Sequence, residues 1–173
     1  MMTSIAGGIS DWPTADFPGV RVNPETLLPQ IVNEEAVQEA LAESEDAADR
    51  VMVLLLRGRT ADAAELLAEA RYRDPESFRL RIFEAEMHRA TNRFDRSVQL
   101  FRQLLNEVQG TDREAVVHQY LGRTHYVSGN AAAAAESFSK ALDLRVATAA
   151  DASLIYSSTL ALQRARDVLE LAS

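Results

Sequence analysis

The 173-residue sequence contains no cysteine. Disulfide bonds, thiolate zinc sites and a cysteine nucleophile are therefore excluded, and a reducing compartment is favoured, so we expect a cytoplasmic protein. The sequence also lacks any apolar run of about 18 residues, the length that would indicate a membrane span. Its first residues, MMTSIAGGISDW, have neither a basic start nor a continuous apolar stretch, so no signal peptide is predicted.

Lysine is nearly absent as well, because Lys140 is the only one and arginine supplies the remaining positive charge. The formal net charge of −8 disfavours nonspecific binding to nucleic acid or to an anionic membrane, since both would be repelled. Arginine on a recognition surface can nevertheless bind a carboxylate through two hydrogen bonds. The composition therefore permits an acidic ligand on a soluble domain, whose 47% apolar content is sufficient for a core.

Proline is rare beyond residue 30, and four of the five prolines lie before it. No helical periodicity accompanies them, so residues 1–32 are predicted to form an extended, flexible arm. This arm carries Trp12 and Phe17 in the segment DWPTADFPGV. One hypothesis is that the segment binds in a groove of its own chain, because tethering raises its effective concentration. The alternative is a disordered terminus.

From Asn33 onward, strong helix formers alternate with short turn signals, and no strand pattern appears beyond Arg57. Helices of about a dozen residues joined by short turns should pack as antiparallel pairs. The turn signals lie at 57–60, 74–75, 91–93, 110–112 and 128–130. The sequence therefore predicts an all-α domain.

The predicted helix pairs repeat. A turn residue is followed after five positions by a small residue, after nine by a bulky apolar one and after twelve by a further packing residue. The three sets are Gly58, Ala63, Leu67 and Ala70; Asn92, Ser97, Phe101 and Leu104; and Gly129, Ala134, Phe138 and Ala141. The steps between the bulky residues are 34 and 37 positions. Over residues 44–148 the sequence resembles the tetratricopeptide repeat family, whose unit is about 34 residues of helix, turn and helix.

The third unit carries the resemblance best, because Leu121 and Gly122 match the Leu-Gly pair of the family. His118, His125 and Ala85 depart from the residues that the family prefers. The resemblance implies a right-handed α–α superhelix of about three helix hairpins with a C-terminal capping helix. Within the helical domain of residues 33–173, the repeats are expected at about 44–77, 78–111 and 115–148, and the capping helix at about 151–172.

Gly122 interrupts a helix, where glycine costs about 1 kcal/mol relative to alanine. We expect a compensating close approach of the paired helix at Ala134, so that a larger side chain at position 122 would overpack the crossing.

The sequence contains no recognisable motif for catalysis or metal binding. The three histidines, His88, His118 and His125, form no metal-binding motif and are expected to be partly buried packing residues. Neither a GxxxxGK phosphate loop nor a GxSxG nucleophile elbow occurs. The sequence therefore predicts no catalytic residues, no metal, no cofactor and no enzymatic activity.

The resemblance also implies that the first helix of each pair lines a concave, peptide-binding surface. Helical periodicity places six candidate residues on it: Met52, Arg79, Ile82, Arg89, Arg123 and Tyr126. The arginines would attract an acidic or amphipathic peptide; the alternative is that they pair with neighbouring glutamates. Family members that capture a C-terminal carboxylate use lysines and asparagines at positions that here hold Ala48, Met52, Phe83, Val116 and Tyr120, so that clamp is not expected.

The sequence is therefore predicted to encode a protein-protein adaptor or scaffold that binds neither nucleic acid nor membrane. Two alternatives stay open, a small chaperone for one partner protein and an oligomeric structural or regulatory subunit. A homodimer could form through an apolar stripe of the last helix that includes Leu160, Leu162 and Leu169.

Overall fold

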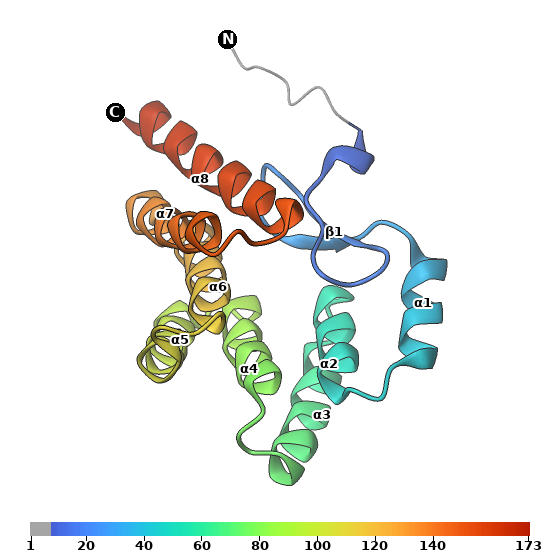
Figure 1. The fold of residues 1–173 in the computed structure, drawn as a ribbon. Coiled ribbons are helices and arrows are strands. Elements are labelled where there is room, and N and C mark those ends of the chain that lie inside the picture. Colours follow the sequence, from blue (N-terminus) through green and yellow to red (C-terminus); the bar gives the residue numbers. More distant parts are fainter. Residues whose placement is uncertain (1–7) are drawn as a thin grey trace.

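The computed structural model describes residues 8–173 and shows a stack of helix pairs with a small hairpin on its hollow side (Figure 1). The amino-terminal elements are η1 (Ile9–Asp11), β1 (Val20–Val22) and β2 (Pro29–Ile31). The helices are α1 (Glu34–Glu43), α2 (Ala47–Leu56), α3 (Thr60–Arg73), α4 (Phe78–Ala90), α5 (Phe94–Val108), α6 (Arg113–Val127), α7 (Ala131–Ala147) and α8 (Ala152–Ala172). The architecture confirms the predicted all-α fold of stacked helix hairpins with a C-terminal capping helix.

Local chemistry explains where the helices begin and turn. Asn33 caps α1 through its side chain, which accepts a hydrogen bond from the backbone N–H of Ala36. The turn residues of the three repeats, Gly58, Asn92 and Gly129, all have positive φ angles, of 74°, 62° and 92°. Glycine and asparagine tolerate this left-handed conformation best, which is why they recur at this position.

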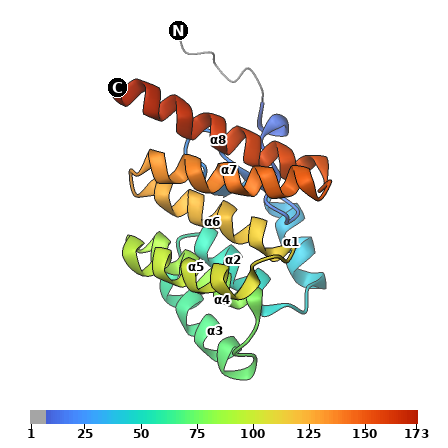
Figure 2. The ribbon, with the colours of Figure 1, turned by 60° about the vertical axis from the view of Figure 1, so that its left-hand side comes forward.

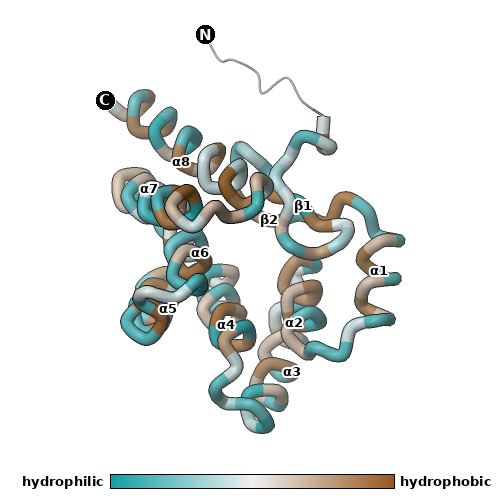
Figure 3. Tube along the Cα trace, in the orientation of Figure 1, coloured by the Kyte–Doolittle hydropathy of each residue, from teal (hydrophilic) through white to brown (hydrophobic). Residues whose placement is uncertain are grey.

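The helices stack in pairs, α2 with α3, α4 with α5 and α6 with α7, and α8 covers the last pair (Figure 2). The repeated small residues lie where helices meet, since Ala63, Ser97 and Ala134 are each 0% exposed. The bulky residues nine positions after each turn are the centres of the core, and Phe101 and Phe138 are among its largest fully buried side chains. Hydrophobic and hydrophilic positions alternate along the helices (Figure 3), and no helix of the described residues has the length and apolarity to span a membrane.

Residues 8–32 differ from the expected extended arm, because they fold against the helices. Strands β1 and β2 pair antiparallel, with Val20 opposite Ile31, and form a hairpin that lies between α8 and the α1–α2 region (Figure 1). Its apolar side chains are buried, with Val20 and Leu27 only 2% and 3% exposed. We call residues 20–31 the N-terminal hairpin.

Gly122 makes the close approach that its position in a helix requires, but to a different residue from the one expected. A Cβ atom placed on Gly122 would lie 2.6 Å from Cε1 of Phe138 and 2.7 Å from its Cδ1, so the neighbour is the Phe138 ring and not Ala134. The ring is 1% exposed and cannot swing into solvent. The glycine is therefore needed because the aromatic side chain of α7 fills the space beside α6.

We expect Gly122→Ala to lower the melting temperature, although alanine is the better helix former. The helix gains about 1 kcal/mol of propensity, whereas overpacking a rigid core costs about 1–3 kcal/mol. Thermal unfolding followed by circular dichroism measures the balance. Phe138→Leu provides the control, because a smaller neighbour should remove most of the penalty when both substitutions are combined. Strictly additive effects of the two substitutions would contradict the contact.

Candidate functional site in the hollow of the helix stack

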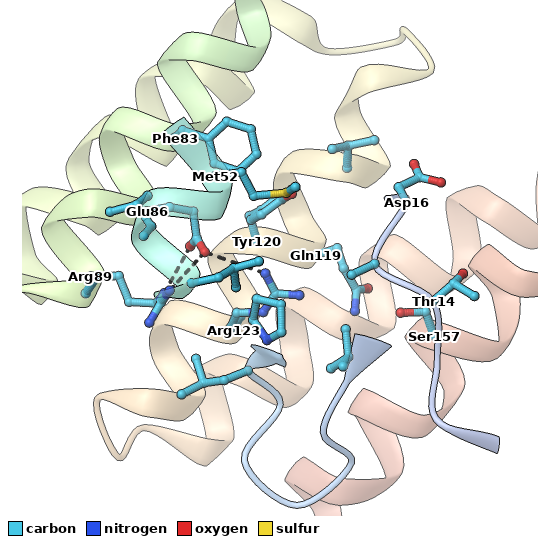
Figure 4. A pocket seen from close by; sticks show the side chains of 18 of the residues that line it. Thr14, Asp16, Met52, Phe83, Glu86, Arg89, Gln119, Tyr120, Arg123 and Ser157 are labelled. Carbon is cyan, nitrogen blue, oxygen red and sulfur yellow. Dashed lines mark hydrogen bonds and ion pairs between the residues drawn. The ribbon is translucent and has the colours of Figure 1, made fainter. Parts of the chain in front are cut away.

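A cavity of about 370 Å³ lies between the N-terminal hairpin and the helices of the stack (Figure 4). Helices α2, α4 and α6 supply most of its wall, α7 and α8 close one end, and residues 14–16 and the N-terminal hairpin cover it. Its apolar lining includes Met52, Leu55, Phe83, Val116, Tyr120 and Leu154. The first helices of the three pairs therefore face a common space, and the hairpin covers part of it.

The structure brings three of the six predicted site residues to this cavity: Met52, Arg89 and Arg123. Ile82 is instead 3% exposed and packs in the core beside Phe101. The position of Ile82 on α4 thus serves the contact between repeats and does not face the hollow side.

Arg79 lies outside the cavity and is paired within its own chain. Its Nη1 is 2.5 Å from Oδ2 of Asp46, and its Nη2 is 2.7 Å from Oδ1 of Asp49. Burial alone would lower the pKa of Arg79, but the hydrogen bonds that it donates to the two carboxylates raise it above its ordinary value. Arg79 therefore ties α4 to the start of α2.

Arg89 and Arg123 share one buried carboxylate, that of Glu86 on α4. Arg89 Nε and Nη2 each lie 3.2 Å from a different oxygen of Glu86, and Arg123 Nη1 lies 3.6 Å from Oε2. The three side chains are only 5–11% exposed, so water screens this cluster weakly. The pairing of arginines with a neighbouring glutamate, left open by the sequence, is what the geometry shows at this end of the cavity (Figure 4).

Arg123 and Tyr126 of α6 also hold the N-terminal hairpin. Arg123 Nε donates to the carbonyl oxygen of Leu27 at 2.9 Å, and the Tyr126 hydroxyl donates to the carbonyl of Glu25 at 2.7 Å. Arg164 of α8 reaches the same Glu25 carbonyl at 3.1 Å and the Tyr126 oxygen at 2.8 Å. Two predicted site residues therefore bind an extended segment, but the segment belongs to the same chain.

The arm segment that was hypothesised to occupy the groove contributes less than the hairpin. Phe17 packs against the core cluster of the first helix pair, and Trp12 is half-buried. Leu27 makes the deeper contact, in a cluster with Phe138 of α7 and Leu162 of α8. Leu27, at the tip of the hairpin, is thus buried more deeply than Trp12 and Phe17.

Arg145 is a buried cation at the other end of the cavity that was not among the residues predicted from the sequence. Arg145 is 6% exposed, and its Nη1 donates to Ser158 Oγ at 2.8 Å, to the Leu154 carbonyl at 3.1 Å and to Gln119 Oε1 at 3.4 Å. Burial lowers the pKa of this guanidinium below its ordinary value. No repeat position marks it, because it lies on the second helix of its pair, where the family pattern predicts only packing.

The three histidines sit in the packed body of the stack, as expected from their helical positions. Burial is the largest cause that lowers the pKa of His88, His118 and His125 below the ordinary value. Within residues 8–173, no group of three His, Asp or Glu side chains is arranged to hold a metal ion.

Comparison with known proteins supports the resemblance seen in the repeat. Residues 54–117 match the family model described as tetratricopeptide repeat. The match begins at the end of α2, contains α3, α4 and α5, and ends within α6. A search of curated proteins and a search of solved structures gave no match.

The histidine environments predict that stability falls as the pH drops. A histidine whose pKa is lower in the folded chain stabilises the fold fully above its unfolded value of about 6.5, and this contribution is lost as protons bind the unfolded state. Urea unfolding should therefore give a smaller free energy at about pH 5.5 than at about pH 7.5, before most carboxylates titrate. Replacing His88, His118 and His125 together by glutamine should flatten this dependence; a constant or rising free energy in the native chain would contradict it.

The contacts of the N-terminal hairpin predict that Arg123→Met loosens it selectively. Hydrogen bonds to charged groups contribute about 1.5–3 kcal/mol, so amide hydrogen exchange at Val22 and Leu27 should become about tenfold faster or more. Amides of α3 should keep their protection. Arg102→Met on the exposed face of α5 is the matched control and should change neither region. Unchanged exchange of the hairpin in Arg123→Met would show that the side chain does not hold it.

Proposed function

We propose that this chain is an adaptor or scaffold that binds a partner protein at the hollow side of its stack, because residues 54–117 match the tetratricopeptide repeat model and such repeats mediate protein-protein contact. The observation that carries the proposal is the cavity at this face, to which all three first helices contribute apolar side chains. Small-residue contacts hold the helices rigid around it, so the surface is preformed.

The partner is proposed to be amphipathic and to bind through its apolar side chains. An acidic peptide would need free arginines, yet Arg89 and Arg123 are held by Glu86, and breaking a buried pair costs about 3–5 kcal/mol. Met52, Leu55 and Val116 remain as apolar contacts at the cavity.

The partner is proposed to bind beside the N-terminal hairpin and not to replace it. Val20, Val22 and Leu27 are buried, and each such side chain contributes roughly 1.5–3 kcal/mol on burial. A short segment that displaced the hairpin would have to recover this energy before gaining any affinity. The part of the cavity that the hairpin leaves uncovered therefore offers the lower-cost site.

The two alternatives, a chaperone for one partner and an oligomeric subunit, differ from an adaptor in stoichiometry. Leu162 is 6% exposed and cannot be part of a surface stripe, whereas Leu169 and Leu171 at the end of α8 are 37% and 79% exposed. A homodimer would therefore use the end of α8, and light scattering of the full chain separates it from a monomeric adaptor.

Site-specific photo-crosslinking tests the proposed partner site. A benzophenone side chain at Leu55, in the cavity wall, should capture a partner from a lysate of the source cell, whereas the same group at the exposed Gln99 of α5 should not. Val116→Asp, also in the cavity wall, should abolish the captured band while circular dichroism shows that the fold is retained. Capture of equal strength from Gln99, or a band that survives Val116→Asp, would contradict the assignment.

A further inference from the structure

The two ends of the cavity differ in the groups that compensate their buried arginines. Glu86, Arg89 and Arg123 form a closed ion-pair cluster at one end (Figure 4). Arg145 lies at the other end with Gln119, Thr14 and Ser157. This second group, which we call the Arg145 end, contains one cation, three neutral polar side chains and the exposed Asp16.

Arg145 is the buried cation that lacks a carboxylate. Within the part of the chain that the structure describes, its hydrogen bonds are made by Nη1 to neutral oxygens, and neither its Nε nor its Nη2 has a protein partner. The remaining acid of the lining, Asp16, is exposed and forms no ion pair among residues 8–173, and residues 1–7 contain no aspartate or glutamate. Burial lowers the pKa of Arg145 even though the charge of Asp16 acts in the opposite direction, so Asp16 compensates the buried cation only in part. Because charged groups are almost never buried without a counter-charge, this arrangement calls for an anion.

The size and lining of the cavity limit the kind of anion. Its volume of about 370 Å³ lies at the lower end of the range for small-molecule sites. Apolar side chains from several helices, including Met52, Phe83 and Leu154, form most of the wall. A strongly hydrated ion such as phosphate would leave these side chains uncovered, whereas an acid with a hydrocarbon body would cover them.

We propose that the cavity binds a small apolar carboxylic acid, with its carboxylate at Arg145 and its hydrocarbon body against the walls formed by α2 and α4. Arg145 supplies the counter-charge, and the Gln119 amide and Ser157 hydroxyl supply neutral donors beside it. The site needs only this chain, so it can be tested in the absence of any protein partner and independently of the proposed adaptor function.

Calorimetric titration of the full chain with octanoate and with octanol tests the site. The two probes share their hydrocarbon body and differ in charge, so octanoate should bind about tenfold more tightly or better, as expected for a charge-assisted hydrogen bond. Arg145→Met should remove this preference, because both probes then meet the same apolar walls. Arg102→Met, on the exposed face of α5, should keep it.

A second variant tests whether the probes lie in the cavity without changing Arg145. Val116→Phe fills the cavity without touching the charge and should weaken both probes by a similar factor. The proposal is overturned if octanoate does not bind, if octanol binds as tightly as octanoate, or if the preference for octanoate survives in Arg145→Met. Equal binding by Val116→Phe and the native chain would also overturn it, since the probes would then lie elsewhere.

Discussion

Two backbone carbonyls, those of Glu25 and Leu27, attach the start of the chain to helices near its end. Their donors are three polar side chains of α6 and α8, and the Leu27 side chain inserts between α7 and α8 beside them. Without this attachment the hollow side of the stack would be an open apolar surface. With it, the hollow is partly covered, and the buried charged side chains around it interact more strongly than they would in water.

Because these arginines are buried, their free energy depends strongly on whether a carboxylate lies beside them. Glu86 neutralises one end and fixes two arginines in place, so this end serves structure and holds the hairpin through Arg123. Arg145 has only neutral acceptors, a state that costs free energy which the surrounding core has to offset. One cavity thus contains two arginines that pair with a carboxylate and a third that has only neutral acceptors. A polar site maintained at such a cost is commonly a functional one.

The sequence predicted the helix stack because its spacing is set by local rules. Left-handed turns select Gly58, Asn92 and Gly129, and close crossings select small residues at fixed distances from them. The hairpin was missed because strands of three residues carry too few positions for an alternating pattern, and the surrounding prolines favour an irregular segment. The contacts that hold the hairpin could not be predicted from the sequence either. Arg123 contacts Leu27 across 96 positions, and nothing in a helical pattern encodes such a pairing.

Repeat proteins ordinarily behave as one-dimensional arrays, in which each unit interacts only with its neighbours and the ends fray first. Here the N-terminal hairpin contacts α2 of the first pair through β2 and α7 and α8 of the last pair through Leu27. The array is thereby closed into a loop of interactions. Loss of either terminal repeat removes support from the other, so the domain should melt as a single cooperative unit, and closing the loop through contacts so distant in sequence should be a late, slow event in folding.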